Sequence, residues 1–336
     1  MSEAKVTRER IMEYAFGFAP SLILEAAVRC HVFDALDAGP KTAAEVATET
    51  RMSPRGARGL LNALVGLEFL TRQGDRYALA PGAETLLVST KPGFAGAMFR
   101  HFSRQLIPHW VHLTESVLTG KPAIAVNQEG QGAEFFREFV EDLFANNYGA
   151  AQALADKLKV AQAKSPVSVI DIAAGSGVWS IALAERSPQV RVTVVDWPAV
   201  VPVCQKVTAR RGVGDRYRYV AGDLLAVDYG TGYNVATLGH ILHSEGERRS
   251  RELLRKVFAA LTPGGTVAIA EMIPNDERTG PPQALMFALN MLVHTDEGDV
   301  FTFGEMSAWL REAGFVDPRK LEVPGPNPLV LANKPG

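Results

Sequence analysis

The chain has 336 residues, of which 47% are hydrophobic and 21% charged, a composition typical of a globular protein. Its formal net charge of -2 gives no overall attraction to nucleic acid or to an anionic membrane surface. Two cysteines, Cys30 and Cys204, exclude a disulfide framework and fit a reducing, cytoplasmic environment. The first ten residues lack the apolar core of a secretory signal, and no apolar run of membrane-spanning length is expected.

The first third of the chain predicts a winged helix-turn-helix. An amphipathic helical pattern covers residues 11–37, and Thr42 precedes a short helix at 43–48. Ser53-Pro54 begins another helix, because serine is a good N-cap and proline is tolerated at the first helical position. Residues 69–72 and 76–79 form a predicted hairpin around the turn Gln73-Gly74-Asp75.

Such a module serves DNA binding or subunit association. Residues 1–100 contain 12 Lys or Arg and 11 Asp or Glu, which leaves a net charge of +1. A DNA-reading domain normally presents a clear basic surface. The balanced charge and the apolar helices favour dimerisation, and DNA binding stays the less favoured alternative. We expect three regions: a dimerisation domain at 1–105, a helical linker and substrate-pocket region at 106–160, and an α/β domain at 161–336.

The helical region is rich in aromatic residues. Most of them are expected in helix packing, although Phe144 and Asn147 are candidates for a wall of the substrate pocket. The last region alternates strands with helices, which predicts a mostly parallel sheet of Rossmann type with right-handed crossovers. Strands are expected at 167–173, 191–196, 217–222, 233–242 and 265–272, followed by a closing pair at 317–324 and 328–334 that makes one terminal strand antiparallel.

The stretch from Val167 to Trp197 resembles the first half of a nucleotide-binding unit. A β-branched strand leads through Asp171 into a small-residue loop with Ala173, Gly175 and Gly177, and the next strand ends at Asp196. An acid about 20 residues after the glycines can bind a ribose diol. A dinucleotide fingerprint needs glycine or alanine where Ser180 stands. The loop resembles motif I of S-adenosylmethionine (SAM)-dependent methyltransferases more closely, with NAD as the alternative.

Polar side chains follow five successive predicted strands, namely Asp171, Asp196, Asp223, His243 and Glu271. Ligands of open α/β sheets bind beyond the carboxyl ends of the strands. If the last two strands are neighbours, the imidazole of His243 and the carboxylate of Glu271 can touch. No cluster has metal-ligand spacing, so no metal is expected.

The run Gly239-His240-Ile241-Leu242-His243-Ser244-Glu245, followed later by Leu261-Thr262-Pro263-Gly264-Gly265, resembles a known family. It is similar to the small-molecule O-methyltransferases related to caffeic acid and hydroxyindole O-methyltransferases. The family pattern has Asp-Trp where Ser244-Glu245 stands. The family also has an N-terminal winged-helix dimerisation domain, so the resemblance covers essentially the whole chain.

The resemblance implies roles for individual residues. His243 corresponds to the general base and Glu271 to the glutamate that orients it. The remaining matches lie in the SAM site: Asp196 and Trp197 at the ribose, Asp223 and Leu224 at the adenine, and Gly239 at the strand end. The family's second catalytic glutamate falls at Val300, so a mechanism with two carboxylates is in doubt.

His240 is a rival base, but strand alternation predicts that it points away from the face of His243. On a predicted helix, Met286, Asn290 and His294 recur at spacings of four. They form either a core stripe or a pocket wall whose amide binds a substrate oxygen.

The sequence therefore predicts a cytoplasmic, homodimeric, SAM-dependent O-methyltransferase acting on a small, hydroxylated, aromatic molecule, with no nucleic acid or membrane partner. The alternatives are C- or N-methylation, a SAM-binding enzyme of other chemistry, and a winged-helix regulator that senses a metabolite.

Overall fold

The structure is a computed structural model that describes residues 6–325 and 327–336. The chain divides into two compact units, Met1–Pro108 and His109–Gly336, and each is described here by itself.

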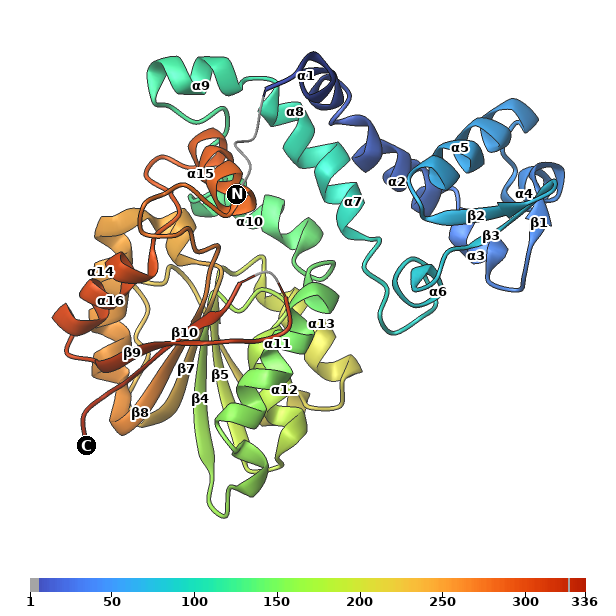
Figure 1. The fold of residues 1–336 in the computed structure, drawn as a ribbon. Coiled ribbons are helices and arrows are strands. Elements are labelled where there is room, and N and C mark those ends of the chain that lie inside the picture. Colours follow the sequence, from blue (N-terminus) through green and yellow to red (C-terminus); the bar gives the residue numbers. More distant parts are fainter. Residues whose placement is uncertain (1–5, 326) are drawn as a thin grey trace. The chain divides into compact units, whose positions relative to one another are not determined.

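The smaller unit combines helices with a three-stranded sheet of order β1-β3-β2 (Figure 1). Its helices are α1 (Arg8–Ala15), α2 (Ala19–Arg29), α3 (Val32–Leu36), α4 (Ala43–Thr50), α5 (Pro54–Gly66), α6 (Ala83–Leu86), α7 (Met98–His101) and the π-helix η1 (Phe102–Leu106). Its strands are β1 (Lys41–Thr42), β2 (Leu70–Gln73) and β3 (Arg76–Leu79). Thr42 and Ser53 cap α4 and α5 as predicted, and the hairpin is present. Leu61, Leu64 and Phe33 fill the core between them.

The helical pattern predicted over residues 11–37 falls in three separate helices, α1, α2 and α3. The backbone leaves helical geometry around Phe16–Phe18, and His31 adopts a left-handed conformation. By length and composition alone, residues Arg8–Arg29 form a stretch that is long and apolar enough to cross a membrane. This differs from the expectation that no apolar run reaches membrane-spanning length. One such stretch near an N-terminus is weak evidence for a membrane span. Several of its large apolar side chains are exposed: Ile11, Met12, Tyr14, Phe16 and Phe18.

The larger unit is built on a seven-stranded sheet of order β6-β5-β4-β7-β8-β10-β9. The strands are β4 (Val167–Ile172), β5 (Val190–Asp196), β6 (Tyr217–Ala221), β7 (Tyr233–Gly239), β8 (Leu261–Ala270), β9 (Val316–Leu321) and β10 (Leu329–Asn333). The strands β6, β5, β4, β7 and β8 pair in parallel, and β10 runs antiparallel to both of its neighbours. The predicted sheet, with an antiparallel strand at the end of the chain, is confirmed.

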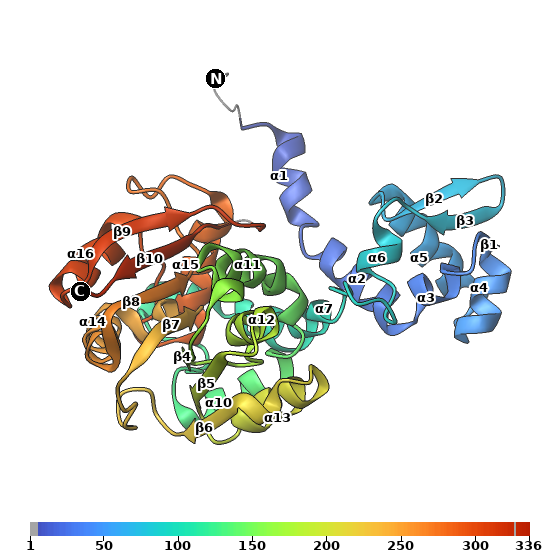
Figure 2. The ribbon, with the colours of Figure 1, turned by 90° about the horizontal axis from the view of Figure 1, so that it is seen from below.

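Helices cover both faces of this sheet, as Figures 1 and 2 show. Before the sheet come α8 (Ile107–Trp110), which contains the division between the units, then α9 (Leu113–Thr119), α10 (Glu129–Phe139), α11 (Phe144–Lys157) and η2 (Val160–Gln162). Between and after the strands lie α12 (Val178–Arg186), α13 (Val201–Arg210), η3 (Gly214–Arg216), α14 (Leu242–Ala260), α15 (Pro282–His294) and α16 (Phe303–Glu312). Helices α14 and α16 pack on one face, and α11, α12 and α13 pack on the other.

The predicted end of β7 was wrong in a way that matters for the site. The strand stops at Gly239 rather than at residue 242, because His240 has a left-handed backbone with φ of 60°. Its amide still donates to Ala270 O on β8 at 2.8 Å. Helix α14 then begins at Leu242, a residue that the sequence still assigned to the strand. His243 therefore lies in the first turn of a helix and not at the end of a strand.

Candidate active site

The loop after β4 has a backbone that only small residues adopt easily. Ala173, Gly175 and Gly177 all have positive φ, at 53°, 57° and 78°. A Cβ on Gly177 would lie 2.8 Å from Cys204 Sγ, so this glycine is also required by packing. The left-handed Ala173 is strained by about 1 kcal/mol, a cost that glycine would avoid.

Asp196 ends β5 beside this loop. Its two carboxylate oxygens accept hydrogen bonds from Gly175 N and Trp197 N, both at 2.7 Å. Burial raises the pKa of Asp196 to about 6, against the effect of these two donors. The carboxylate is thus held at the glycine turn, where sequence reasoning placed the ribose acid.

Asp171 differs from the expectation that its carboxylate meets the cofactor. Its side chain is fully buried and accepts hydrogen bonds from Ser180 Oγ at 2.5 Å and from Thr237 Oγ1 at 2.7 Å. The carboxylate therefore joins β4, α12 and β7 beneath the loop. Burial raises the pKa of Asp171 to about 6. Strand position alone could not distinguish a carboxylate under the turn from one facing a ligand.

The other predicted cofactor residues occupy different surroundings. Asp223 is half-buried, and its Oδ2 accepts from Arg249 at 3.1 Å. The side chain of Leu224 is buried in the core. A Cβ on Gly239 would lie 2.1 Å from Trp179 Nε1, which makes glycine necessary at this strand end.

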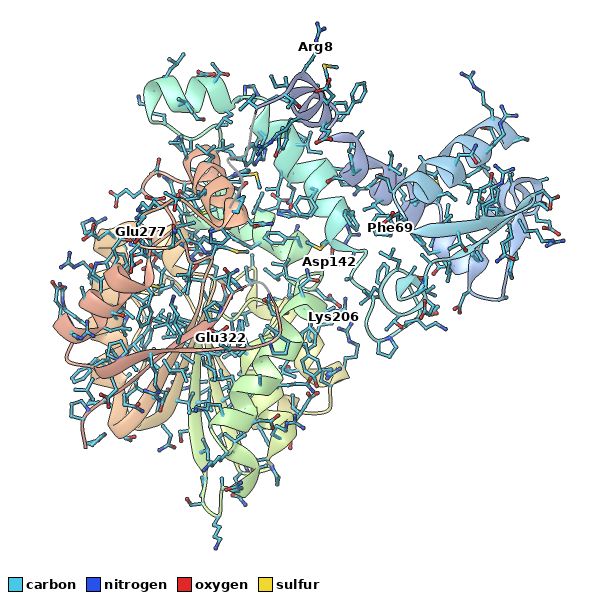
Figure 3. The ribbon with its side chains drawn as sticks, viewed as in Figure 1. Arg8, Phe69, Asp142, Lys206, Glu277 and Glu322 are labelled. Atoms are coloured by element: carbon cyan, nitrogen blue, oxygen red, sulfur yellow. The ribbon has the colours of Figure 1, made fainter. Side chains whose placement is uncertain are left out.

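Helix α10 and the turn after it lie against this side of the unit. Val140 would be 3.4 Å from a Cβ on Gly175, and the Trp197 ring packs 5.9 Å from that of Phe136. Figure 3 labels Asp142 in this turn and Lys206 on α13, and Lys206 forms an ion pair with Glu141 at 2.9 Å. Val140 thus borders the loop that carries the glycines, and Phe136 borders the residue that follows β5.

The predicted contact between His243 and Glu271 is confirmed. His243 Nδ1 lies 2.6 Å from Glu271 Oε2, and both side chains are buried. Glu271 Oε1 accepts from the backbone amides of Leu242 and His243 at 2.7 and 3.3 Å. Burial by itself raises the pKa of Glu271, but His243, as a charge and as a donor, holds that pKa below its ordinary value. The carboxylate fixes the ring, so that Nδ1 carries the proton and Nε2 keeps the lone pair.

His243 Nε2 is open to another molecule. In the described part of the chain, only Asn127 Oδ1 and Ser307 Oγ are side-chain polar atoms that are fully buried without a partner. No hydrogen bond within that part reaches Nε2, so this atom keeps accessible surface. The Phe287 ring meets the imidazole edge to face, with centroids 4.9 Å apart.

The prediction that His240 points away from His243 was wrong. The two rings lie 6.2 Å apart, because the left-handed backbone at His240 ends the alternation of β7. Polar atoms of His240, His243 and Glu271 lie within 4.8 Å of one another, a cluster of metal-binding residue types that the sequence spacing did not predict. Both oxygens of Glu271 already accept hydrogen bonds, so we interpret the cluster as an acid–base network.

The predicted substrate residues separate into two groups. Asn147 reaches the site, since its Oδ1 lies 3.2 Å from His240 Nε2. Phe144 does not, because its ring stacks on Tyr148 at 5.2 Å and packs into the core. Met286 is 55% exposed, whereas its neighbour Phe287 faces His243. The predicted helix was right, but its site-facing residues start one position later.

Asn290 and His294 have partners that the sequence did not reveal. Trp110 Nε1 donates to Asn290 Oδ1 at 2.8 Å. His294 Nδ1 donates to Asn290 O at 2.9 Å, so its Nε2 accepts from His109 Nδ1 at 3.0 Å. An amide on an apolar helix face signals a missing partner, but nothing in the sequence points to a tryptophan 180 positions earlier.

Comparisons with known proteins agree with this geometry. Residues 110–316 match the family model of the O-methyltransferase domain, and residues 12–89 match that of the O-methyltransferase dimerisation domain. The chain belongs to the O-methyltransferase family.

Among relatives of this O-methyltransferase is the tetracenomycin polyketide synthesis 8-O-methyl transferase TcmO of Streptomyces glaucescens, 33% identical, with 97% of this chain and 96% of the relative covered. The 3-hydroxy-5-methyl-1-naphthoate 3-O-methyltransferase of Streptomyces sahachiroi is 31% identical over 96% of this chain and 94% of its own length. The structure of human N-acetylserotonin methyltransferase with SAM matches with a TM-score of 0.83 at 25% identity, and both chains are covered completely.

The enzyme is a SAM-dependent O-methyltransferase, and the residues present fit that cofactor. The glycine turn leaves room that side chains would fill, and the Asp196 carboxylate at the turn has the acceptor oxygens that a ribose diol requires. When bound, SAM supplies a methyl group on a positively charged sulfur.

We expect the variant Asp196→Ala to bind S-adenosylhomocysteine about 10- to 100-fold more weakly in calorimetry, as is typical for lost hydrogen bonds to a charged group. Donors from the ligand favour the charged carboxylate, so wild-type affinity should rise as the pH rises through about 6 and then level off. Asp196→Asn should lose this pH step. Asp215→Ala, at a carboxylate 81% exposed, is the control. Unchanged affinity in Asp196→Ala would exclude the ribose role.

Proposed function

We propose that this enzyme transfers the methyl group of SAM to a hydroxyl group of an aromatic small molecule, with His243 as general base. The observation that carries the proposal is the buried His243–Glu271 pair, in which Nε2 of the imidazole is accessible to the substrate that accepts the methyl group. An imidazole held as the Nδ1–H tautomer keeps a lone pair on Nε2 that can take a proton.

The chain's own residues then have distinct tasks. His243 Nε2 would remove the proton of the acceptor hydroxyl and leave an oxygen nucleophile for the methyl group that bound SAM would supply. Glu271 stabilises the imidazolium that forms. Methyl transfer from a sulfonium is downhill, so the remaining requirement is positioning and exclusion of water. Val300 is buried and apolar, so the proposal needs a single carboxylate beside the base.

The surroundings of the base support an aromatic acceptor. Phe287 on α15 places a ring beside His243. Asn290 lies on the same face of α15, and the side chain of Trp110 donates a hydrogen bond that orients its amide. The names of the two Streptomyces relatives specify 8-O-methylation in tetracenomycin polyketide synthesis and 3-O-methylation of a hydroxynaphthoate. A screen with labelled SAM against phenols, enols, amines and carboxylates tests the proposal. Transfer to amines alone would overturn it in favour of N-methylation.

We further propose that the enzyme is a homodimer formed through its first 105 residues. The match to a dimerisation domain and the exposed apolar side chains of α1 and of the turn after it support this assembly. Obligate dimers commonly bury more than about 2,000 Å² in total. A second copy of the chain that buries these side chains would also account for the apolar stretch Arg8–Arg29 without a membrane.

The double variant Phe16→Glu/Phe18→Glu should dissociate this dimer. The two rings stack on each other at 6.3 Å and are 66% and 56% exposed, so charges there would be buried unpaired in an interface. We expect wild type at twice the chain mass in light scattering at micromolar concentration, and the variant at the mass of one chain. Val316→Glu, on β9 of the larger unit, is the control. A monodisperse wild-type monomer would contradict the proposal.

A further inference from the structure

His240 presents a hydrogen-bond acceptor at the active site. Its Nε2 lies 3.2 Å from Asn147 Oδ1, and Asn147 Nδ2 donates to Leu143 O at 3.4 Å. A carbonyl oxygen can only accept, so the Asn147 amide keeps its NH2 group towards Leu143 and its oxygen towards the imidazole. His240 Nε2 therefore carries the proton, and Nδ1 holds a lone pair.

This lone pair is accessible. No hydrogen bond reaches His240 Nδ1 within residues 6–325 and 327–336, and the atom is not among the fully buried polar atoms without a partner. Burial lowers the pKa of His240 to about 4, so the ring is neutral at physiological pH. A neutral ring of such low basicity is a poor base for a phenol but a good acceptor of a hydrogen bond.

The backbone places this acceptor next to the proposed base. His240 has φ of 60°, a conformation that costs an L-residue about 1 kcal/mol or more. Strained residues of this kind cluster at functional sites. The consequence here is that polar atoms of His240 and His243 come within 4.8 Å of each other.

We propose that His240 selects acceptors that carry a second hydrogen-bond donor beside the hydroxyl that is methylated. The inference rests on the proposed role of His243. While His243 Nε2 removes the proton of the first hydroxyl, His240 Nδ1 accepts a hydrogen bond from the second. Two hydroxyls in ortho or peri positions of an aromatic system are close enough to reach both imidazoles. Methylation of one hydroxyl removes a donor, so the enzyme should transfer one methyl group and then release a monomethyl ether.

The test uses catechol and a peri-dihydroxynaphthalene, each paired with its own monomethyl ether. Wild type should favour each diol over its ether by about tenfold in kcat/KM, once the factor of two for the diol's two equivalent hydroxyls is removed. A ratio of this size is expected for the loss of one hydrogen bond between substrate and enzyme. His240→Phe keeps a ring but removes the acceptor, so the preference should fall to near one and the yield of dimethyl ether should rise. Asn147→Leu removes the oxygen that keeps the proton of His240 on Nε2, so that Nδ1 holds the lone pair only part of the time. The preference for diol over ether should then be intermediate. Affinity for S-adenosylhomocysteine should stay unchanged in both variants.

Four results would overturn the inference, and they separate it from the proposed function. A wild-type enzyme that methylates diol and ether equally well, or a His240→Phe variant with the wild-type preference, removes the role of His240 and leaves that of His243 intact. A loss of S-adenosylhomocysteine affinity in His240→Phe that matches the loss of activity assigns His240 to the cofactor instead. Failure of wild type to methylate any of the four probes contradicts the proposed function on phenols, and the inference with it.

Discussion

The variant His243→Ala should lose about 10²- to 10⁴-fold in kcat while binding S-adenosylhomocysteine as tightly as wild type. A positioned general base supplies an acceleration of this size, and the residues that we expect at the cofactor, the Gly175 turn after β4 and Asp196 at the end of β5, do not belong to α14. Raising the pH should partly restore the rate on an acidic phenol, because its proton then leaves without a base. Initial rates with labelled SAM, together with calorimetry, measure both quantities.

The matched control is His112→Ala, which removes an exposed imidazole from the same unit and should leave kcat unchanged. A His243→Ala variant that turns over at the wild-type rate would show that this histidine is not the base. A parallel loss of cofactor affinity would show instead that the variant damages the whole site.

The variant Glu271→Gln should be nearly as inactive as His243→Ala, for a reason that only the hydrogen bonds reveal. Glu271 Oε1 accepts from the amides of Leu242 and His243, so a glutamine must keep its oxygen there. Its NH2 group then faces His243 Nδ1 and forces the proton onto Nε2, the atom that has to accept one. The analogous change in the serine protease triad reduces kcat by about 10⁴-fold through the wrong tautomer.

Two measurements distinguish this effect from unfolding. Nitrogen NMR of the His243 ring should show the proton on Nδ1 in wild type and on Nε2 in Glu271→Gln, with S-adenosylhomocysteine affinity retained. On an acidic phenol, elevated pH should partly restore the rate of Glu271→Gln, as it does for His243→Ala, because the phenol's proton then leaves without a base; an unfolded variant would not recover. A variant that keeps more than a tenth of wild-type activity would contradict the tautomer argument.

Several features of this enzyme could be predicted because their causes lie within a few residues. Thr42 with Glu45 and Ser53 with Pro54 define helix starts through hydrogen bonds three positions apart. The loop that ends at Gly177 has positive φ angles that favour glycine, and its small residues alone predicted a nucleotide-binding turn. The contact between His243 and Glu271 followed from strand order, since residues after neighbouring parallel strands meet at one edge of the sheet.

Other features depend on partners far away in the sequence. Asp171 has the position of a ligand-binding acid, but Ser180 and Thr237 surround it and turn it into a buried structural carboxylate. Which face of α15 meets the site was decided by packing, so Phe287 approaches His243 whereas Met286 is exposed. Helical periodicity gives the spacing of a stripe but not its rotation about the helix axis.

His240 shows most clearly what the sequence alone could not predict. Period-two alternation predicts the direction of a side chain only while the strand lasts, and a single left-handed residue reverses it. The sequence by itself determined the family, the order of strands and helices, and the residue types at the sheet edge. Tertiary structure alone decided that β7 ends one residue before His240, because the tight contact of Gly239 with Trp179 and the bond from His240 to Asn147 act across the fold.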